Sequence, residues 1–468
     1  MKIFLTVCFC ILFIVPTLAQ TFEPKGNFKM TVGDGIQHFQ MLDDGKTLLL
    51  IGLQNAVFWD IENNKVSESS AFENNFSIRY GASSPDGRKV LSLDKDFYMR
   101  EKSGSTSYVI DLHTGKRILK FDEKIGYGAW SKNGKVLVTA NTCFRSPYGC
   151  SFKDITFTFR DGESLEKLSS ITIDKISGFF LSPDGERVFT SEKIKKNGKS
   201  FHDLKVWNTR TGRIEQTLLG ENDYARSGGI FSSENENFIG VVAEKKSDKK
   251  DKTVFVWKTT GNSLTKYQIN AAEKIKGDDL IFSLDEKLIA FDTGDKVQYY
   301  EIASGEKFSE SGKDRVPDLW IADNRLVIYR DSKILRAYPT GSENPVYYND
   351  LVYETTEEEV SPGRTDDVPI DYTVTSPDAN GNIFLFASNR NLRIYDSKNG
   401  KLLQTLVSPE KNPDDDCIDK VINKFDKVFF KKETGKNVLS KTVWSKDYRY
   451  ILGRSYEYDS VYVWERID

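Results

Sequence analysis

The sequence predicts an all-β protein built from a repeated unit of four antiparallel strands. A Gly- or Asn-containing turn followed by an alternating strand recurs along the chain, and a second kind of strand, ending in an aromatic and a polar residue, follows each copy. The turn glycines Gly87, Gly134 and Gly185 lie 47 and 51 residues apart. That period is expected of a propeller blade and is far too long for a leucine-rich repeat.

The turn-strand copies give the expected number of blades. Four are clear, at 42–52, 83–93, 131–140 and 182–191, and five are weaker, at 232–242, 283–292, 322–330, 376–387 and 445–453. Nine copies predict nine blades in a single ring over residues 20–468. Because propellers typically have four to eight blades, the alternative is eight blades with one copy acting as an insertion.

The second kind of strand completes each unit. It occurs at 56–60, 204–208, 254–258, 297–301, 392–396 and 461–465, and a short turn follows most copies. Each unit is therefore interpreted as strands a to d of one sheet, stabilised mainly by packing between neighbouring blades. We assign the strand tryptophans to this packing: Trp59, Trp207, Trp257 and Trp464.

These features resemble the WD-repeat β-propeller family over essentially the whole chain after residue 19. The resemblance lies in the Ser-Pro-Asp-Gly turns, the Trp-Asp-like pairs such as Trp59-Asp60, and the Thr-Gly-Lys turns. No Gly-His dipeptide opens a repeat, so the family's internal hydrogen-bonded tetrad is not implied. The resemblance does imply that an N-terminal strand closes the ring, and the segment 27–32 would pair with the final strand, 461–468.

The same resemblance assigns the connections to two sides of the ring. The a-b and c-d turns, which are short here, point one way, and the b-c and d-a connections point the other way. Long insertions fall in b-c connections at 94–107, 141–154, 192–203 and 244–252, and in d-a connections at 353–367 and 408–443. Long loops on one side of a rigid scaffold are the usual place for binding functions.

Aromatic and basic residues in the first two insertions are the candidate contact residues. They are Phe97, Tyr98, Arg100, Phe144, Arg145 and Tyr148. The alternative is that the aromatic side chains pack the insertions onto the ring. The later b-c insertions are rich in lysine, which predicts either a basic surface or simply solvated hairpin ends.

The N-terminus has the pattern of a secretory signal peptide at 1–19. Lys2 precedes an apolar run over 3–15, and small residues lead to an expected cut after Ala19. Thirteen apolar residues are too few to cross a bilayer, which needs about 20. We therefore expect a secreted or periplasmic protein with no integral membrane segment after cleavage.

Three cysteines remain after the expected cleavage. Cys143 and Cys150 bracket six residues and can form a disulfide in an oxidising compartment, with free thiols as the alternative. Cys417 is most simply a free thiol.

The composition argues against several functions. The chain is 38% hydrophobic, 12% aromatic and 29% charged, with a net charge of -3, so it is not a general nucleic-acid binder. It has no Gly-x-Ser-x-Gly elbow, and its three histidines do not suggest a metal centre. Asp414, Asp416 and Asp419 lack the glycine and glutamate of a calcium loop. We expect no cofactor and no metal.

Two functional hypotheses follow. The first is a monomeric, non-catalytic scaffold that binds a protein, peptide or glycan through the face carrying the long b-c loops. The alternative is a propeller enzyme, a lyase or hydrolase, that uses carboxylates at the central channel.

Overall fold

The computed structural model is all β over the part of the chain that it describes. These residues are 21–29, 35–73, 80–93, 107–123, 125–141, 153–196, 199–219, 223–225, 230–233, 236–245, 252–261, 264–270, 280–283, 285–293, 296–311, 317, 319–321, 326–331, 334–340, 347–350, 373–375, 383–387, 392–397, 399–406, 439–444, 449–455 and 460–467. Within them, no helix is long and apolar enough to cross a membrane.

The strands pair antiparallel into successive sheets. The first two sheets contain β2 (His38–Met41), β3 (Thr47–Ile51), β4 (Asn55–Asp60) and β5 (Lys65–Ala71), then β6 (Tyr80–Ser83), β7 (Lys89–Ser92), β8 (Tyr108–Asp111) and β9 (Arg117–Lys120). Three later sheets follow. One contains β22 (Leu280–Phe282), β23 (Leu288–Asp292), β24 (Val297–Glu301) and β25 (Lys307–Ser311), and the next contains β26 (Leu319–Ile321), β27 (Leu326–Asp331), β28 (Ile334–Pro339) and β29 (Tyr347–Asp350). The third contains β30 (Thr373–Thr375), β31 (Ile383–Ala387), β32 (Leu392–Asp396) and β33 (Leu402–Leu406).

The last sheet combines the two ends of the described chain. It contains β34 (Leu439–Trp444), β35 (Tyr450–Ser455), β36 (Ser460–Ile467) and, beside β36, β1 (Thr21–Lys29). Sequence analysis placed this N-terminal strand at 27–32, whereas the pairing runs from Thr21 opposite Ile467 to Lys29 opposite Ser460. The N-terminal segment thus occupies the outer position of the last sheet, as expected, but begins earlier.

Between these lies one twelve-stranded sheet. Its strands are β10 (Tyr127–Trp130), β11 (Val136–Ala140), β12 (Lys153–Asp161), β13 (Lys167–Leu181), β14 (Arg187–Lys196), β15 (Lys199–Asn208), β16 (Ile214–Thr217), β17 (Asp223–Ala225), β18 (Phe231–Ser232), β19 (Phe238–Lys245), β20 (Lys252–Lys258) and β21 (Lys266–Asn270). The fifteen-residue β13 pairs first with β12 and then, from Ile176 onward, with β14. One strand therefore serves as strand d of one unit and strand a of the next.

The a-b turns share one hydrogen-bonded design. Ser84 Oγ donates to Asp86 Oδ1 (2.6 Å) and accepts from Lys89 N (2.9 Å). Gly87 sits at φ +70, in the left-handed region that favours glycine, and a Cβ there would also meet Leu42 Cδ2 at 2.4 Å. Buried serines accept the equivalent backbone N–H in four later turns: Ser131, Ser182, Ser233 and Ser283.

The c-d turns use a carboxylate or amide oxygen in the same way. The amide of Ser164 donates to Asp161 Oδ1 (2.9 Å), and this hydrogen bond lowers the pKa of Asp161 below its ordinary value. In the first sheet, the Asn63 side chain donates to Asp60 (2.7 Å) and lowers the pKa of that carboxyl group. At Asp60, Asn208 and Asp396, the polar residue that ends the aromatic strand thus closes the turn.

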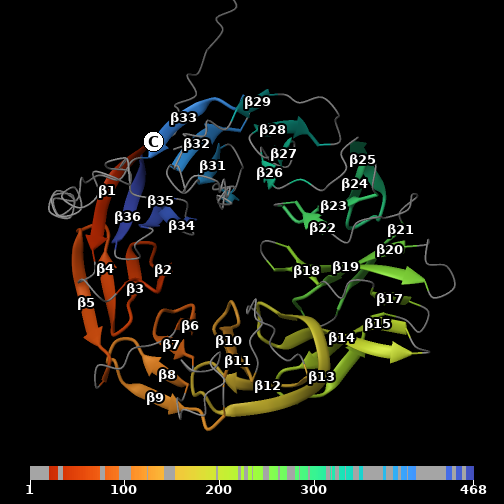
Figure 1. The fold of residues 1–468 in the computed structure, drawn as a ribbon, viewed down its shortest axis with the longest axis horizontal. Coiled ribbons are helices and arrows are strands. Elements are labelled where there is room, and N and C mark those ends of the chain that lie inside the picture. Colours follow the sequence, from red (N-terminus) through yellow and green to blue (C-terminus); the bar gives the residue numbers. More distant parts are fainter. Residues whose placement is uncertain are drawn as a thin grey trace, which may run out of the picture.

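The hydrophobic core lies between sheets. Five of the described core clusters join two sheets that follow one another, and one joins the first sheet (Leu48, Trp59) to the last (Tyr450, Val463). Two more lie within the twelve-stranded sheet, between its successive four-stranded units. Figure 1 shows the sheets in chain order around a common centre. These pairings and clusters confirm an all-β propeller architecture of four-stranded antiparallel sheets.

The strand tryptophans differ in burial. Trp59, Trp257 and Trp464 are each at most 1% exposed, whereas Trp207 is only partly buried. The indole of Trp207 instead donates to Thr190 Oγ1 (2.9 Å).

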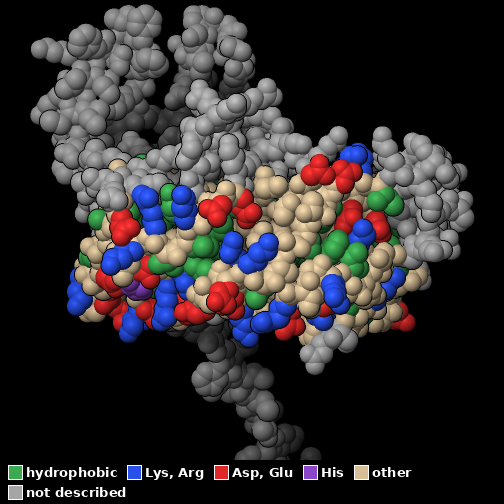
Figure 2. All heavy atoms as spheres, turned by 90° about the horizontal axis from the view of Figure 1, so that it is seen from below, with side chains coloured by type: hydrophobic (Ala, Val, Ile, Leu, Met, Phe, Trp, Pro, Cys, Tyr) green, Lys and Arg blue, Asp and Glu red, His purple; other side chains and the backbone are tan. Residues whose placement is uncertain are grey.

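Charged side chains cover the outer edge. Figure 2 shows basic and acidic groups interspersed over the side of the disc that faces the bottom of Figure 1. At the junction of the last and first sheets, Arg449 reaches Glu465 (2.7 Å) and Glu62 (3.1 Å), while Lys25 on β1 reaches Glu465 (2.9 Å).

Replacing Trp464 by alanine should lower the free energy of unfolding by about 3–5 kcal/mol, because the change leaves a cavity between the last two sheets. Urea denaturation measures this loss. The matched control is Ile214→Ala, at a side chain that is 47% exposed, where the expected change is within about 0.5 kcal/mol. Equal losses in both variants would contradict packing between sheets as the main source of stability.

Candidate binding surface

The strand topology distinguishes two sides of the structure by the connections that leave the strand ends on each side. On one side the a-b and c-d turns touch: Gly162 N donates to Lys135 O (2.7 Å), and Thr209 Oγ1 donates to Gly185 O (2.6 Å). We call this the turn side. The b-c connections leave the opposite ends of the strands, and we call that the long-hairpin side.

The candidate residues named from the sequence fall outside the described residues. Phe97, Tyr98 and Arg100 lie in 94–100, and Phe144, Arg145, Tyr148, Cys143 and Cys150 lie in 142–150. The acidic segment 353–367 and the run 414–419 are also outside them. The roles of these residues stay predictions.

One insertion expected as a connection is instead a paired hairpin. Strands β14 and β15 continue their register through 192–203, from Glu192 opposite Asp203 to Lys196 opposite Lys199. The inner strand β13 stops pairing with β14 at Glu192. The hairpin therefore extends about 13 Å past the inner strand, at roughly 3.3 Å per residue.

A sequence signal for this hairpin was present. The last pair leaves two residues, Asn197 and Gly198, between the strands. Asn-Gly between two strand-like runs is the strongest short-range indication of a tight β-hairpin. The segment was expected to be a long connection, and the paired hairpin was not predicted.

A three-residue strand then joins this hairpin to its neighbour. Ala225 of β17 pairs with His202 on β15, while Asp223, Tyr224 and Ala225 pair with β19. Strands β12 to β20 thus form one continuous hydrogen-bonded path on the long-hairpin side. No sequence pattern indicates this link, because β17 lies in a connection without strand periodicity.

A polar network supports the base of the hairpin. Lys205 Nζ contacts Glu192 Oε2 (2.6 Å), and Thr190 Oγ1 donates to Glu192 Oε1 (3.3 Å). Trp207 in turn donates to Thr190. Both charged groups are largely buried, with side chains 21% and 12% exposed. The network fixes β14 against β15 where the hairpin leaves the body of the sheet.

The hairpin beyond this network presents both charged and apolar groups. Lys193 is exposed and makes no hydrogen bond or ion pair with another described residue, and Ile194 is 39% exposed. His202, opposite Lys193, is half-buried. Burial and the charge of Lys193 lower the pKa of His202 below its ordinary value.

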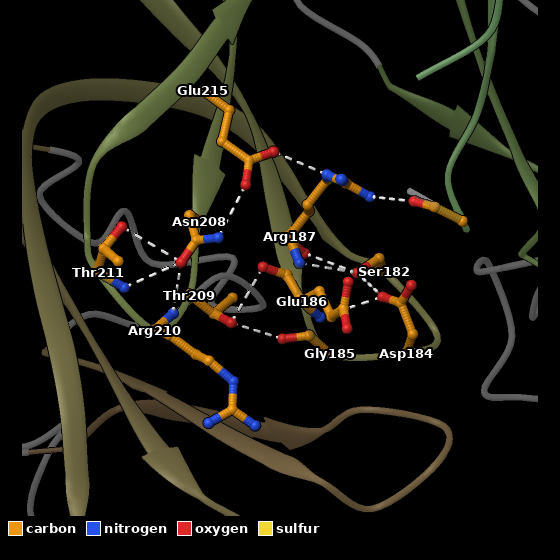
Figure 3. Close-up of polar contacts among 11 residues, drawn as sticks. Ser182, Asp184, Gly185, Glu186, Arg187, Asn208, Thr209, Arg210, Thr211 and Glu215 are labelled. Atoms are coloured by element: carbon orange, nitrogen blue, oxygen red, sulfur yellow. Dashed lines mark hydrogen bonds and ion pairs between the residues drawn. The ribbon is translucent and has the colours of Figure 1, made fainter. Parts of the chain in front are cut away.

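The turn side is tied together by interblade contacts, with Arg187 as the best example (Figure 3). Arg187 Nε contacts Glu215 Oε2 (2.7 Å), and Nη1 donates to Gly261 O (2.8 Å) in the next c-d turn. Burial raises the pKa of Glu215, but hydrogen bonds from Asn208 and Arg187 hold that pKa below its ordinary value. Lys89 reaches Glu163 in the same manner (2.8 Å).

Figure 1 shows β2, β6, β10 and β22 nearest the centre, and the described first strands of the sheets carry no Asp or Glu. The same holds for the second half of β13, 176–181. Across the described chain, no three His, Cys, Asp or Glu side chains gather as a metal site.

No protein-family profile matches the sequence, and no curated protein matches it. Solved structures with a similar fold include a eukaryotic initiation factor, with 12% identity and a TM-score of 0.49 over 82% of this chain and 92% of that chain. BamB from Moraxella catarrhalis has 10% identity and a TM-score of 0.43 over 95% and 100%. The Swd1 propeller domain of Myceliophteria thermophila has 12% identity and a TM-score of 0.39 over 95% and 99%. The fold assignment therefore rests on this chain's own strand pairings.

Arg187→Ala should lower the free energy of unfolding by roughly 2–3 kcal/mol, somewhat less than a fully buried pair because Glu215 is 30% exposed. The Glu215 contribution is present above pH 4.5 and is lost as the pH falls through its lower folded pKa. The Arg187→Ala variant should therefore lose less stability between pH 7 and pH 3 than the unmodified protein does. Denaturation at pH 7 and pH 3 measures both effects, with the exposed Arg210→Ala as control. If Arg187→Ala were as stable as Arg210→Ala, the stabilising role assigned to the Arg187 contacts would be contradicted.

Proposed function

We propose that the protein is an exported, non-catalytic propeller scaffold that binds a protein, peptide or glycan partner through its long-hairpin side. The observation that supports this most directly is the continuous strand path from β12 to β20, which holds two neighbouring b-c hairpins in one sheet. A hairpin fixed in this way presents side chains at defined positions, so little conformational entropy is lost when a partner binds.

We also propose that the scaffold is a closed ring of nine blades. The twelve-stranded sheet divides into three runs of the a-to-d pattern once β13 is shared between two of them and β17 is set aside as a link. With the six separate sheets, the described strands then make nine blades. Pairing of β1 with β36, and packing of the first sheet on the last, support closure.

The charge of the long-hairpin side favours an anionic partner. Lys193, Lys195, Lys196 and Lys199 occupy the extended part of the β14–β15 hairpin. The acidic residues of that hairpin lie at its base: Glu192, which already contacts Lys205, and Asp203 opposite it. A local excess of positive charge raises the rate at which an anionic partner is encountered, and its effect falls with ionic strength.

Export rests on the N-terminal sequence, where the predicted cut after Ala19 lies two residues before β1 begins at Thr21. The predicted disulfide between Cys143 and Cys150 belongs to the same proposal, since it requires an oxidising compartment.

Reversing the charge of the hairpin should abolish partner capture. In Lys193→Glu/Lys195→Glu, we expect at least ten-fold less partner recovered from extracellular or periplasmic extract by the mature protein. The melting temperature should change by no more than a few degrees, because Lys193 is exposed. The matched control is Lys116→Glu/Lys135→Glu, at exposed residues of the β8–β9 and β10–β11 turns on the turn side. Undiminished capture by the hairpin variant would move the site elsewhere.

Shortening the two aromatic insertions tests the rest of the proposed surface. We expect removal of 95–105 and 142–150, each replaced by a short Gly-Ser linker, to abolish capture without changing the melting temperature by more than a few degrees. Asn141 is kept, because its side chain accepts a hydrogen bond from Thr156 N (2.9 Å). Full capture by this variant would confine the site to the lysine hairpins.

A further inference from the structure

The link between the two long hairpins has one weak point. Strand β17 is held to β19 by three residue pairs but to β15 by a single pair, Ala225 with His202. The backbone contact that joins the hairpins is therefore made by the residue that carries a half-buried imidazole.

A second proton on that imidazole would leave one of its N–H groups without an acceptor among the described residues. Its Nδ1 atom is buried and has no hydrogen-bond partner among the described residues. A protonated Nδ1 would be a buried donor without an acceptor, which is costly.

The charges around His202 add to this cost. Opposite it on β14 is Lys193, whose charge disfavours a second cation. The nearest acidic residue on β14, Glu192, is already in contact with Lys205. By strand position, the other charged residues at the link are Asp203 on β15, Asp223 on β17, and Glu244 and Lys245 on β19.

The sign of the effect follows from the lowered pKa of His202. In the unfolded chain the imidazole titrates near its ordinary value of 6.5. The stability that neutral His202 contributes is present above pH 6.5. It is lost as the pH falls from 6.5 through the lower folded value.

We infer that the link between the β14–β15 and β19–β20 hairpins is an acid-sensitive joint, in which protonation of His202 releases β17 from β15. The local opening exposes the imidazole to water without unfolding the ring, because the contacts between sheets and the turn side do not involve it. The two lysine-bearing hairpins are then coupled at neutral pH and independent in acid. The inference does not depend on the identity of a partner.

Hydrogen exchange of the full mature protein tests this joint. With rates corrected for intrinsic exchange, we expect protection in 199–204 and 223–225 to fall at least ten-fold between pH 7.5 and pH 5. Protection in β3, β4 and β36 should stay unchanged. His202→Gln, which cannot be protonated, should show no such fall, and the matched control His113→Gln should behave as the unmodified protein.

A second variant keeps the test decisive if His202→Gln is poorly folded. Lys193→Gln removes the neighbouring charge, so the midpoint of the protection loss should move to higher pH. Equal protection at both pH values in the unmodified protein would overturn the inference. So would a loss of protection that persists in His202→Gln, or a midpoint that Lys193→Gln does not move.

Discussion

The structure depends on the burial of both faces of each sheet against its neighbours. A single four-stranded sheet of this size has two apolar faces and cannot be stable alone. In most of the described clusters, residues of two different sheets share one core, as Phe58 and Ile110 do between the first two sheets; in the other two, successive four-stranded units of the twelve-stranded sheet do so. The first and last sheets face the same requirement, and Trp59 meets Val463 across their junction. The proposed closed ring would leave neither terminal sheet exposed.

The two sides of the scaffold use their polar residues differently. On the turn side, serine, aspartate and asparagine side chains are engaged in turn closure, and Arg187 and Lys89 reach into the next blade. These groups are committed to holding the ring. On the long-hairpin side, the paired network stops at Glu192 and Lys205, and beyond it Lys193 and Ile194 face solvent. The proposed function therefore places the partner on the side with uncommitted groups.

Much of the fold was predictable because its signals are local. The Ser-x-Asp and Asp-x-x-x-Gly turns close within five or six residues, and the strands around them alternate with a period of two, so their positions are visible in the sequence. The features that were not predicted depend on pairing with strands far away in the sequence. Strand β13 runs through two blades, β17 pairs with strands of two hairpins, and β1 takes its limits from β36. The aromatic candidates in 94–107 and 141–154 lie outside the described residues, so for them the prediction stands untested.

The link through β17 depends on different contacts from those that set the global stability of the protein. Core packing between sheets sets the global stability, whereas β17 is attached to β15 by one residue pair. Opening at such a point costs far less than global unfolding, since local openings in proteins span the range from near zero to the full free energy. A change at His202 can therefore alter the relative freedom of two hairpins while the ring stays intact. With one weak joint on the long-hairpin side, the relative arrangement of the two hairpins can change under conditions that leave the fold unchanged.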